Sequence, residues 1–186
     1  MKKLYGYRTA DQVSLRADGS PIRGACAGAV CLWLRERVHG QPLMVPPDLA
    51  TAAALQQMFT DMAHLRHQQV DASISITYKL HAIGLQTNEE FGTKKIVDLC
   101  GHVRHKPGLY YLSVSFLRRG VRGLHAIGLQ IQQNKGYYLF NPDEGLLELS
   151  FGELVDYLVL HYGSEGQFIA IRLCGNEGQF AAAGSS

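Results

Sequence analysis

The sequence lacks the features that define several large classes of protein. It has no apolar run long enough to cross a bilayer, and its start, MKKLYGYRTADQ, has two lysines but no apolar stretch like that of a secretory signal peptide. Charged residues make up 18% of the chain, the formal net charge is only +2, and no long Lys/Arg stripe occurs. We therefore expect no transmembrane segment and no nucleic-acid partner.

Cysteine is scarce, and its spacing is not that of a disulfide framework or a zinc site. The four cysteines are Cys26, Cys31, Cys100 and Cys174. No C-x-x-C pair occurs, and the C-x-H-x-x-H spacing of Cys100, His102 and His105 matches no common zinc pattern. The sequence therefore predicts reduced thiols, no metal and no cofactor.

The length of 186 residues, with 46% hydrophobic residues, suits one globular domain. Residues 1–23 are polar and contain glycine, and the last residues are small. We predict an N-terminal arm or loop over 1–23, one folded domain over 24–175, and a flexible tail over 176–186.

The first half of the domain reads as helical. Residues 26–39 place apolar side chains at helical spacing, and Gly40 and Pro42 end that helix. A second helix follows Pro46 and Pro47 over 48–69, with Asp48 as its N-cap. Cys31 lies inside the first helix, where we expect it to belong to the core.

Two further segments of this half are less uniform. Residues 73–85 alternate like a strand but also fit an extension of helical structure. Residues 91–105 predict a short amphipathic helix. Its inward side chains are expected to be Ile96, Val97, Cys100 and Val103.

The second half is rich in short β-prone runs separated by turn residues. One helix interrupts them over 150–162, opened by Ser150 and Glu153 at the spacing of a capping box. The order predicts an α+β fold in which helices pack on a mostly antiparallel sheet. The β-prone runs are 108–116, 124–132, 135–141, 146–150 and 167–173.

Cys26 stands at the start of the first predicted helix, among small residues. The N-terminus of a helix offers unpaired backbone N–H groups and a positive dipole end, which lower the pKa of a thiol and can hold an oxyanion. A buried structural thiol is the commoner fate of a cysteine. The surrounding sequence alone leaves both readings open.

A nucleophilic cysteine needs a base within hydrogen-bond reach, and the chain has eight histidines. Four lie in surface-like or capping contexts: His39, His64, His67 and His161. Two more flank the charged loop near Cys100. The last two, His81 and His125, each begin a copy of HAIGLQ, at 81–86 and 125–130, with flanks that differ. His125 has the better context, because it opens a strand that fixes its side chain.

The strand after His125 ends in Asn141-Pro142-Asp143-Glu144-Gly145. If the two strands pair as a hairpin around residues 133–136, Asn141 lies at the same end as His125. Its amide oxygen can then accept the Nδ1–H of the imidazole and fix the ring. Taken alone, each of these features suits an ordinary turn or sheet. Together, in the order Cys, His, Asn, they favour a catalytic triad of Cys26, His125 and Asn141.

Three motifs resemble those of the YopT/AvrPphB family of bacterial effector cysteine proteases, which are papain-like. They are GACAGAVCLWL (24–34), YYLSVSF (110–116) with GLHAIGL (123–129), and YLFNPDEG (138–145). The resemblance implies a papain-like fold with Cys26 as nucleophile and His125 as base. Asn141 stands where that family usually has aspartate, so Asp143 is an alternative orienting group. Papain-like enzymes also place a polar side chain before the cysteine to support the oxyanion, and Ser20 is our candidate.

The resemblance also implies a role. Members of the family enter host cells and cleave host proteins. We therefore expect a cysteine protease with a protein substrate, a secretion chaperone as a further partner, and secretion without a signal peptide into the cytoplasm of a host or target cell. The bacterial cytoplasm is the alternative location.

Two alternative functions stay open. The first is a papain-like deamidase, amidase or acyltransferase acting on an amide of a protein or peptidoglycan. The second is a non-enzymatic binding module on a degenerate protease fold.

Overall fold

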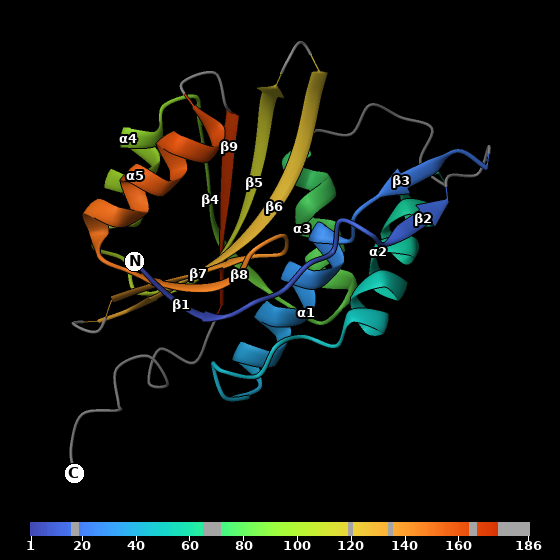
Figure 1. Ribbon diagram of the computed structural model, residues 1–186, viewed down its shortest axis with the longest axis horizontal. Coiled ribbons are helices and arrows are strands. Elements are labelled where there is room, and N and C mark those ends of the chain that lie inside the picture. Colours follow the sequence, from blue (N-terminus) through green and yellow to red (C-terminus); the bar gives the residue numbers. More distant parts are fainter. Residues whose placement is uncertain (16–18, 65–71, 119–120, 134–135, 164–166, 175–186) are drawn as a thin grey trace.

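The computed structural model describes residues 1–15, 19–64, 72–118, 121–133, 136–163 and 167–174. The predicted α+β class is confirmed. One antiparallel sheet lies between two groups of helices, with α1, α2 and α3 on one face and α4 and α5 on the other (Figure 1). None of the helices formed by these residues is long and apolar enough to cross a membrane.

Seven strands form the main sheet, in the order β1-β8-β7-β6-β5-β9-β4, and every neighbouring pair is antiparallel. A separate hairpin, β2 and β3, lies beside α2. The five β-prone runs of the second half correspond to β5–β9. The strands are β1 Lys2–Tyr5, β2 Val13–Leu15, β3 Pro21–Arg23, β4 Thr87–Thr93, β5 Gly108–Arg118, β6 Val121–Gln132, β7 Gly136–Asn141, β8 Gly145–Leu149 and β9 Gln167–Leu173.

Two helices, the second and the last along the chain, begin where the sequence places their caps. The backbone N–H of Thr51 donates to Asp48 Oδ2 at 2.7 Å, and the capping box of Ser150 and Glu153 is present. The ambiguous segment 73–85 is helical up to Ala82; the end of the second predicted helix, 65–69, lies outside the described residues. The helices are α1 Cys26–Val38, α2 Leu49–His64, α3 Ala72–Ala82, α4 Ile96–Val103 and α5 Phe151–Tyr162.

One inward position of α4 was wrong. Val97 is 74% exposed, whereas Leu99 is 1% exposed and belongs to the core. A helix that buries Ile96 buries residues three, four and seven positions later, and Val97 points about 100° away from that face. The other inward predictions, Ile96, Cys100 and Val103, are confirmed.

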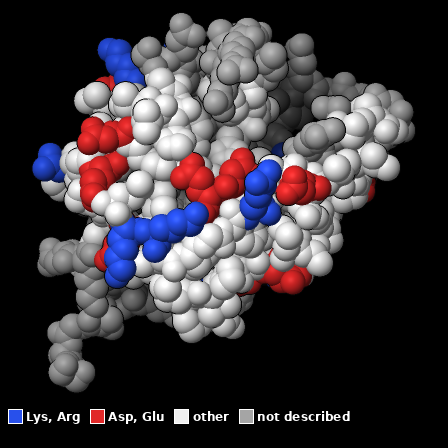
Figure 2. All heavy atoms as spheres, viewed as in Figure 1, with Lys and Arg blue, Asp and Glu red and all other residues white. Residues whose placement is uncertain are grey.

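Two strands arise from segments that sequence reasoning did not treat as strands. Residues 2–5, predicted as part of an arm or loop, form the edge strand β1 against β8. Residues 87–93, TNEEFGT, form the opposite edge strand β4 against β9, so the helix predicted over 91–105 was wrong at its start and begins at Ile96. β1 has only four residues and β4 is mostly polar, and both lie at sheet edges, where packing does not demand an apolar pattern. On the face in Figure 2, acidic and basic side chains are interspersed.

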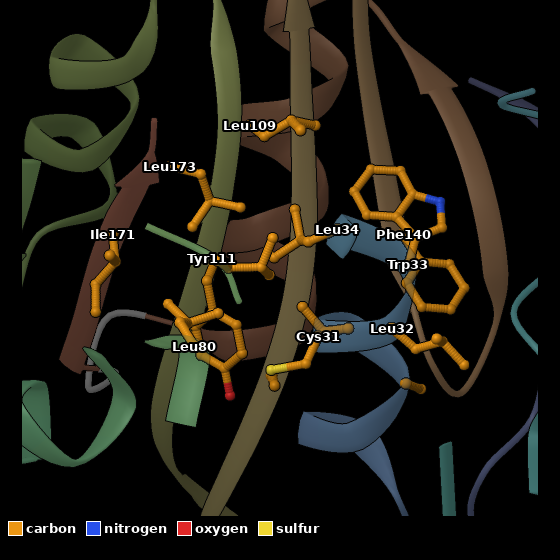
Figure 3. Packing of buried hydrophobic residues seen from close by; sticks show 14 of the residues in the cluster. Cys31, Leu32, Trp33, Leu34, Leu80, Leu109, Tyr111, Phe140, Ile171 and Leu173 are labelled. Atoms are coloured by element: carbon orange, nitrogen blue, oxygen red, sulfur yellow. The ribbon is translucent and has the colours of Figure 1, made fainter. Parts of the chain in front are cut away.

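Aromatic packing joins α1 to the sheet. Trp33 stacks on Phe140 of β7 with ring centroids 5.4 Å apart (Figure 3). It also lies against Gly128 of β6, where an added Cβ would be 2.7 Å from the indole. This close approach places α1 across β6 and β7 and thereby locates its first residue, Cys26.

Candidate active site

The site lies where β6 extends past β7. β6 pairs with β5 over Val121–Ile131 but with β7 only from Gly128 onward. The turn after β7 and the N-terminus of α1 lie beside the stretch of β6 that β7 does not cover. His125 lies on that stretch, and Asn141 is the last residue of β7. The predicted hairpin is therefore confirmed, and it brings these two residues to one end.

Cys26 is the first residue of α1 and is partly buried. Its sulfur hydrogen-bonds to the His125 side chain and to the backbone of Ala126, both on the stretch of β6 that β7 does not cover. Cys31, by contrast, is buried in the core as predicted, and burial raises its thiol pKa to about 12. The two cysteines of α1 thus have opposite chemical environments.

The electrostatics of Cys26 and His125 favour a thiolate–imidazolium pair. Burial acts to raise the pKa of Cys26, but the hydrogen bond and positive charge of His125, together with the Ala126 N–H, outweigh it and lower that pKa. Burial acts to lower the pKa of His125, but the bond to Cys26, its negative charge and Asn141 raise it. A charged pair forms when each partner stabilises the charged form of the other.

Asn141 holds the imidazole through the nitrogen opposite to the predicted one. His125 Nε2 lies 3.0 Å from Asn141 Oδ1, so Nε2–H donates to the amide oxygen. The expected Nδ1–H donor was wrong. The ring lies between Cys26 at the start of α1 and the turn after β7.

The Asn141 side chain is buried and is itself fixed on all sides. Its Nδ2 donates to the Tyr157 hydroxyl at 2.6 Å and to Glu144 Oε1 at 3.4 Å, while its Oδ1 also accepts the Asp143 backbone N–H at 3.0 Å. Since both donors of Nδ2 are occupied by acceptors, the amide keeps its oxygen toward His125. Sequence reasoning missed Tyr157, because a tyrosine at an inward helix position reads as core.

Asp143, the alternative orienting group, lies near the ring but does not hydrogen-bond to it. Its Oδ2 is 4.0 Å from His125 Nδ1, and its side chain is 47% exposed. Its other oxygen, Oδ1, accepts a hydrogen bond from Thr9 Oγ1 at 3.2 Å. Asn141 therefore orients the ring, and Asp143 adds a negative charge beside it.

A glutamine of α2, which the sequence did not indicate, lies against the N-terminus of α1. Gln56 of α2 accepts the backbone N–H of Gly28 at 3.2 Å through Oε1. Gly28 has no room for a side chain, since a Cβ there would lie 2.1 Å from the carbonyl oxygen of Ala52. The close α1–α2 packing brings the Gln56 amide to the first turn of α1. Ser20, six residues before Cys26, is partly buried, and its role in oxyanion support stays a prediction.

The remaining histidines lie elsewhere or play other parts. His81 is exposed near the end of α3 and contacts the Thr87 hydroxyl at 3.3 Å. His102 stacks on Phe91 and pairs with Glu89. His161 stacks on Tyr157 and lies 3.4 Å from Glu144 Oε1. Within the described part of the chain, no group of His, Cys, Asp and Glu side chains could hold a metal ion.

The fold is papain-like, with helices packed on an antiparallel sheet and a cysteine at the start of a helix facing a histidine on a strand. Among solved structures, the chain is similar to the crystal structure of the Pseudomonas avirulence protein AvrPphB. The TM-score is 0.58 and the identity 18%, with 79% of this chain and 90% of that chain covered. At that identity the likeness shows the fold alone.

Comparisons of sequence add no relative: no protein-family model matches the chain, and no curated protein matches it. The likeness of fold agrees with the family that the three motifs resemble. It indicates a protease-like fold and leaves catalysis to be argued from the site.

Proposed function

We propose that the chain is a papain-like cysteine protease with Cys26 as nucleophile, His125 as acid–base and Asn141 as the orienting group. One observation carries the proposal. The only cysteine at the N-terminus of a helix in the described residues is hydrogen-bonded to a histidine that a buried asparagine holds. A structural cysteine requires neither the histidine nor the asparagine behind it.

The chemistry follows from this arrangement. The Cys26 thiolate attacks the peptide carbonyl carbon, and the oxygen takes the negative charge near the N-terminus of α1. The His125 imidazolium gives its proton to the leaving amine as the C–N bond breaks, which leaves a thioester on Cys26. Neutral His125 then takes a proton from water, whose oxygen attacks the thioester and releases the acid and the thiolate.

We propose that the substrate is a protein, and that the chain acts on it in the cytoplasm of a host or target cell after secretion without a signal peptide. The support is the motif resemblance and the likeness of fold to an avirulence protein. A secretion chaperone is a proposed further partner.

The test uses a thiolate-selective electrophilic peptide probe, with the labelled cysteine identified by mass spectrometry. We expect label on Cys26 in the unaltered chain, none after Cys26→Ala, and unchanged labelling after Cys174→Ala, since Cys174 is exposed but outside the site. A Cys26 that stays unlabelled at neutral pH would indicate the non-enzymatic binding module instead.

A second readout separates protease from deamidase. Protein mixtures from a candidate target cell are incubated with the unaltered chain and with Cys26→Ala, and their peptides are compared. New chain ends that depend on Cys26 support proteolysis. Converted glutamine or asparagine side chains without new ends would replace it with the deamidase alternative.

A further inference from the structure

The residues after β1 lie along the turn that carries Asn141 and Asp143. The backbone N–H of Thr9 donates to the Pro142 carbonyl oxygen at 3.0 Å, and that of Tyr7 to the Glu144 carbonyl oxygen at 3.4 Å. Gly145 is packed so closely beneath this segment that a Cβ would lie 1.9 Å from the Tyr5 carbonyl oxygen. The N-terminal segment is thus built against the candidate active site.

Thr9 links this N-terminal segment to a side chain that lies beside His125. It is fully buried, and its hydroxyl donates to Asp143 Oδ1 at 3.2 Å. The other oxygen of the same carboxylate, Oδ2, lies 4.0 Å from His125 Nδ1. That distance exceeds a hydrogen bond, so Asp143 acts on the ring through its charge. A carboxylate that is 47% exposed would otherwise be free to turn toward water.

We propose that Thr9 is a positioning residue whose hydroxyl aims the Asp143 carboxylate at His125, and that Asp143 thereby supplies the negative charge that the Asn141 side chain lacks. The inference rests on the proposed function of Cys26 and His125. If Thr9 acts in this way, the N-terminal segment is part of the active site. The two tasks of the third member of a catalytic triad, orientation and charge, then fall to two residues. Asn141 orients the ring, and Asp143 sets the charge.

The charged and titratable groups around His125 come from three elements. Cys26 approaches from α1, Asp143 and Glu144 from the turn after β7, and Tyr157, His161 and Tyr162 from α5. The tyrosines stay neutral, because burial raises the pKa of each well above its ordinary value. Among the carboxylates, Asp143 is the one whose charge acts on both Cys26 and His125.

The charge of Asp143 shifts the pKa of Cys26 and that of His125 in the same direction. The negative charge of Asp143 favours the imidazolium and raises the pKa of His125, and it disfavours the nearby thiolate and raises the pKa of Cys26. Removing the charge should lower both apparent pKa values of the pair. Loosening of the structure that leaves the Asp143 carboxylate beside His125 would not move both pKa values in that direction.

The experiment measures alkylation of Cys26 by iodoacetamide across pH, read on the Cys26 peptide by mass spectrometry. For Asp143→Asn we expect both inflections to move to lower pH by about 0.5–1 unit, a modest shift because the carboxylate is half exposed. Thr9→Val should move them the same way by a smaller amount, and Thr9→Ser, which keeps the hydroxyl, should not. Thr9→Ala repeats the test if Thr9→Val does not fold.

Thr93→Val is the matched control, since Thr93 Oγ1 contacts the Asp98 carboxylate at 3.4 Å on β4, three strands away from β6 in the sheet. It should leave the profile unchanged. A depressed Cys26 pKa that stays in place in Asp143→Asn would overturn the charge role, and a shift there with none in either Thr9 variant would overturn the positioning role. An ordinary thiol pKa for Cys26 in the unaltered chain would overturn the proposed function itself, and the inference with it.

Discussion

The six residues HAIGLQ occur twice in the chain and adopt two different structures. The copy at 81–86 begins in the last turn of α3 and continues into a turn, whereas the copy at 125–130 is entirely strand in β6. His81 is exposed on its helix, while His125 contacts Cys26 and Asn141. Identical local sequence therefore decides neither the secondary structure nor the chemistry of the histidine; the surrounding chain decides both.

The glycines of the two copies show how this happens. Gly84 has φ +83° and forms the turn that ends α3, a conformation that other residues rarely adopt. Gly128 carries no such φ, and its lack of a side chain leaves room for Trp33 instead. In one copy glycine supplies backbone freedom, and in the other it supplies space. The leucines, Leu85 and Leu129, are buried in both.

The largest difference between the copies should appear when each histidine is removed. His125→Ala should reduce proteolysis and Cys26 labelling by about 10²–10⁴-fold, because the base and the charge that stabilises the thiolate are both lost. His81→Ala should change the activity by less than about twofold. Steady-state rates and labelling rates at pH 7 provide the measurement. Inactivation by His81→Ala would reverse the assignment of the base.

Alanine substitutions of Gly128 and Gly84 should distinguish an effect on stability from an effect on the geometry of the site. Gly128→Ala should destabilise the fold by about 1–3 kcal/mol and slow Cys26 labelling, because the new Cβ pushes Trp33 and α1 away from β6. Gly84→Ala should destabilise it by about 1–2 kcal/mol through backbone strain alone. Denaturant unfolding and labelling of the folded protein are measured on both. Equal labelling in the two variants would show that the Trp33 contact does not locate Cys26.

Tyr157→Phe should make His125 less well held, and thus more like His81, the histidine of the other HAIGLQ copy. The variant removes the nearer of the two acceptors of the Asn141 Nδ2, so Asn141 and His125 lose orientation, and we expect a loss of about fivefold in kcat. Tyr137→Phe is the control, since its hydroxyl donates to the Arg104 carbonyl oxygen away from the site. An equal loss in both variants would assign the effect to general packing.

The smallest difference should come from the glutamines that close the two copies. Gln86 is exposed, whereas Gln130 is buried and its Oε1 makes no hydrogen bond among the described residues. Gln130→Met should therefore leave stability unchanged or raise it by up to about 1 kcal/mol, and Gln86→Met should change it less. Thermal unfolding compares them. Marked destabilisation by Gln130→Met would reveal a partner for this amide.

Much of the fold was predictable because its signals are local. The capping residues Asp48 and Ser150 fix helix starts through contacts within three residues, and runs of β-prone residues between turn residues mark β5 to β9. The edge strands β1 and β4 were not predictable, since β1 has only four residues and β4 consists mostly of polar ones. Val97 failed for a related reason: a hydrophobic residue in a short helix can still face solvent.

The candidate site divides in the same way. Cys26 at a helix start, His125 at a strand and Asn141 in a turn could be found from chain order and a hairpin. The ring nitrogen that meets Asn141 could not, nor could Tyr157, Gln56 and Thr9, because each acts on the site across a long separation in sequence.

By itself, the sequence determined the positions of most helices and strands and a short set of reactive side chains, since these follow from propensity, capping and period along a few consecutive residues. Only the tertiary structure decided which nitrogen of the His125 ring would be held, and that the N-terminal segment would lie against the site. Burial and hydrogen bonding between distant segments set those outcomes, and no local run of residues contains that information.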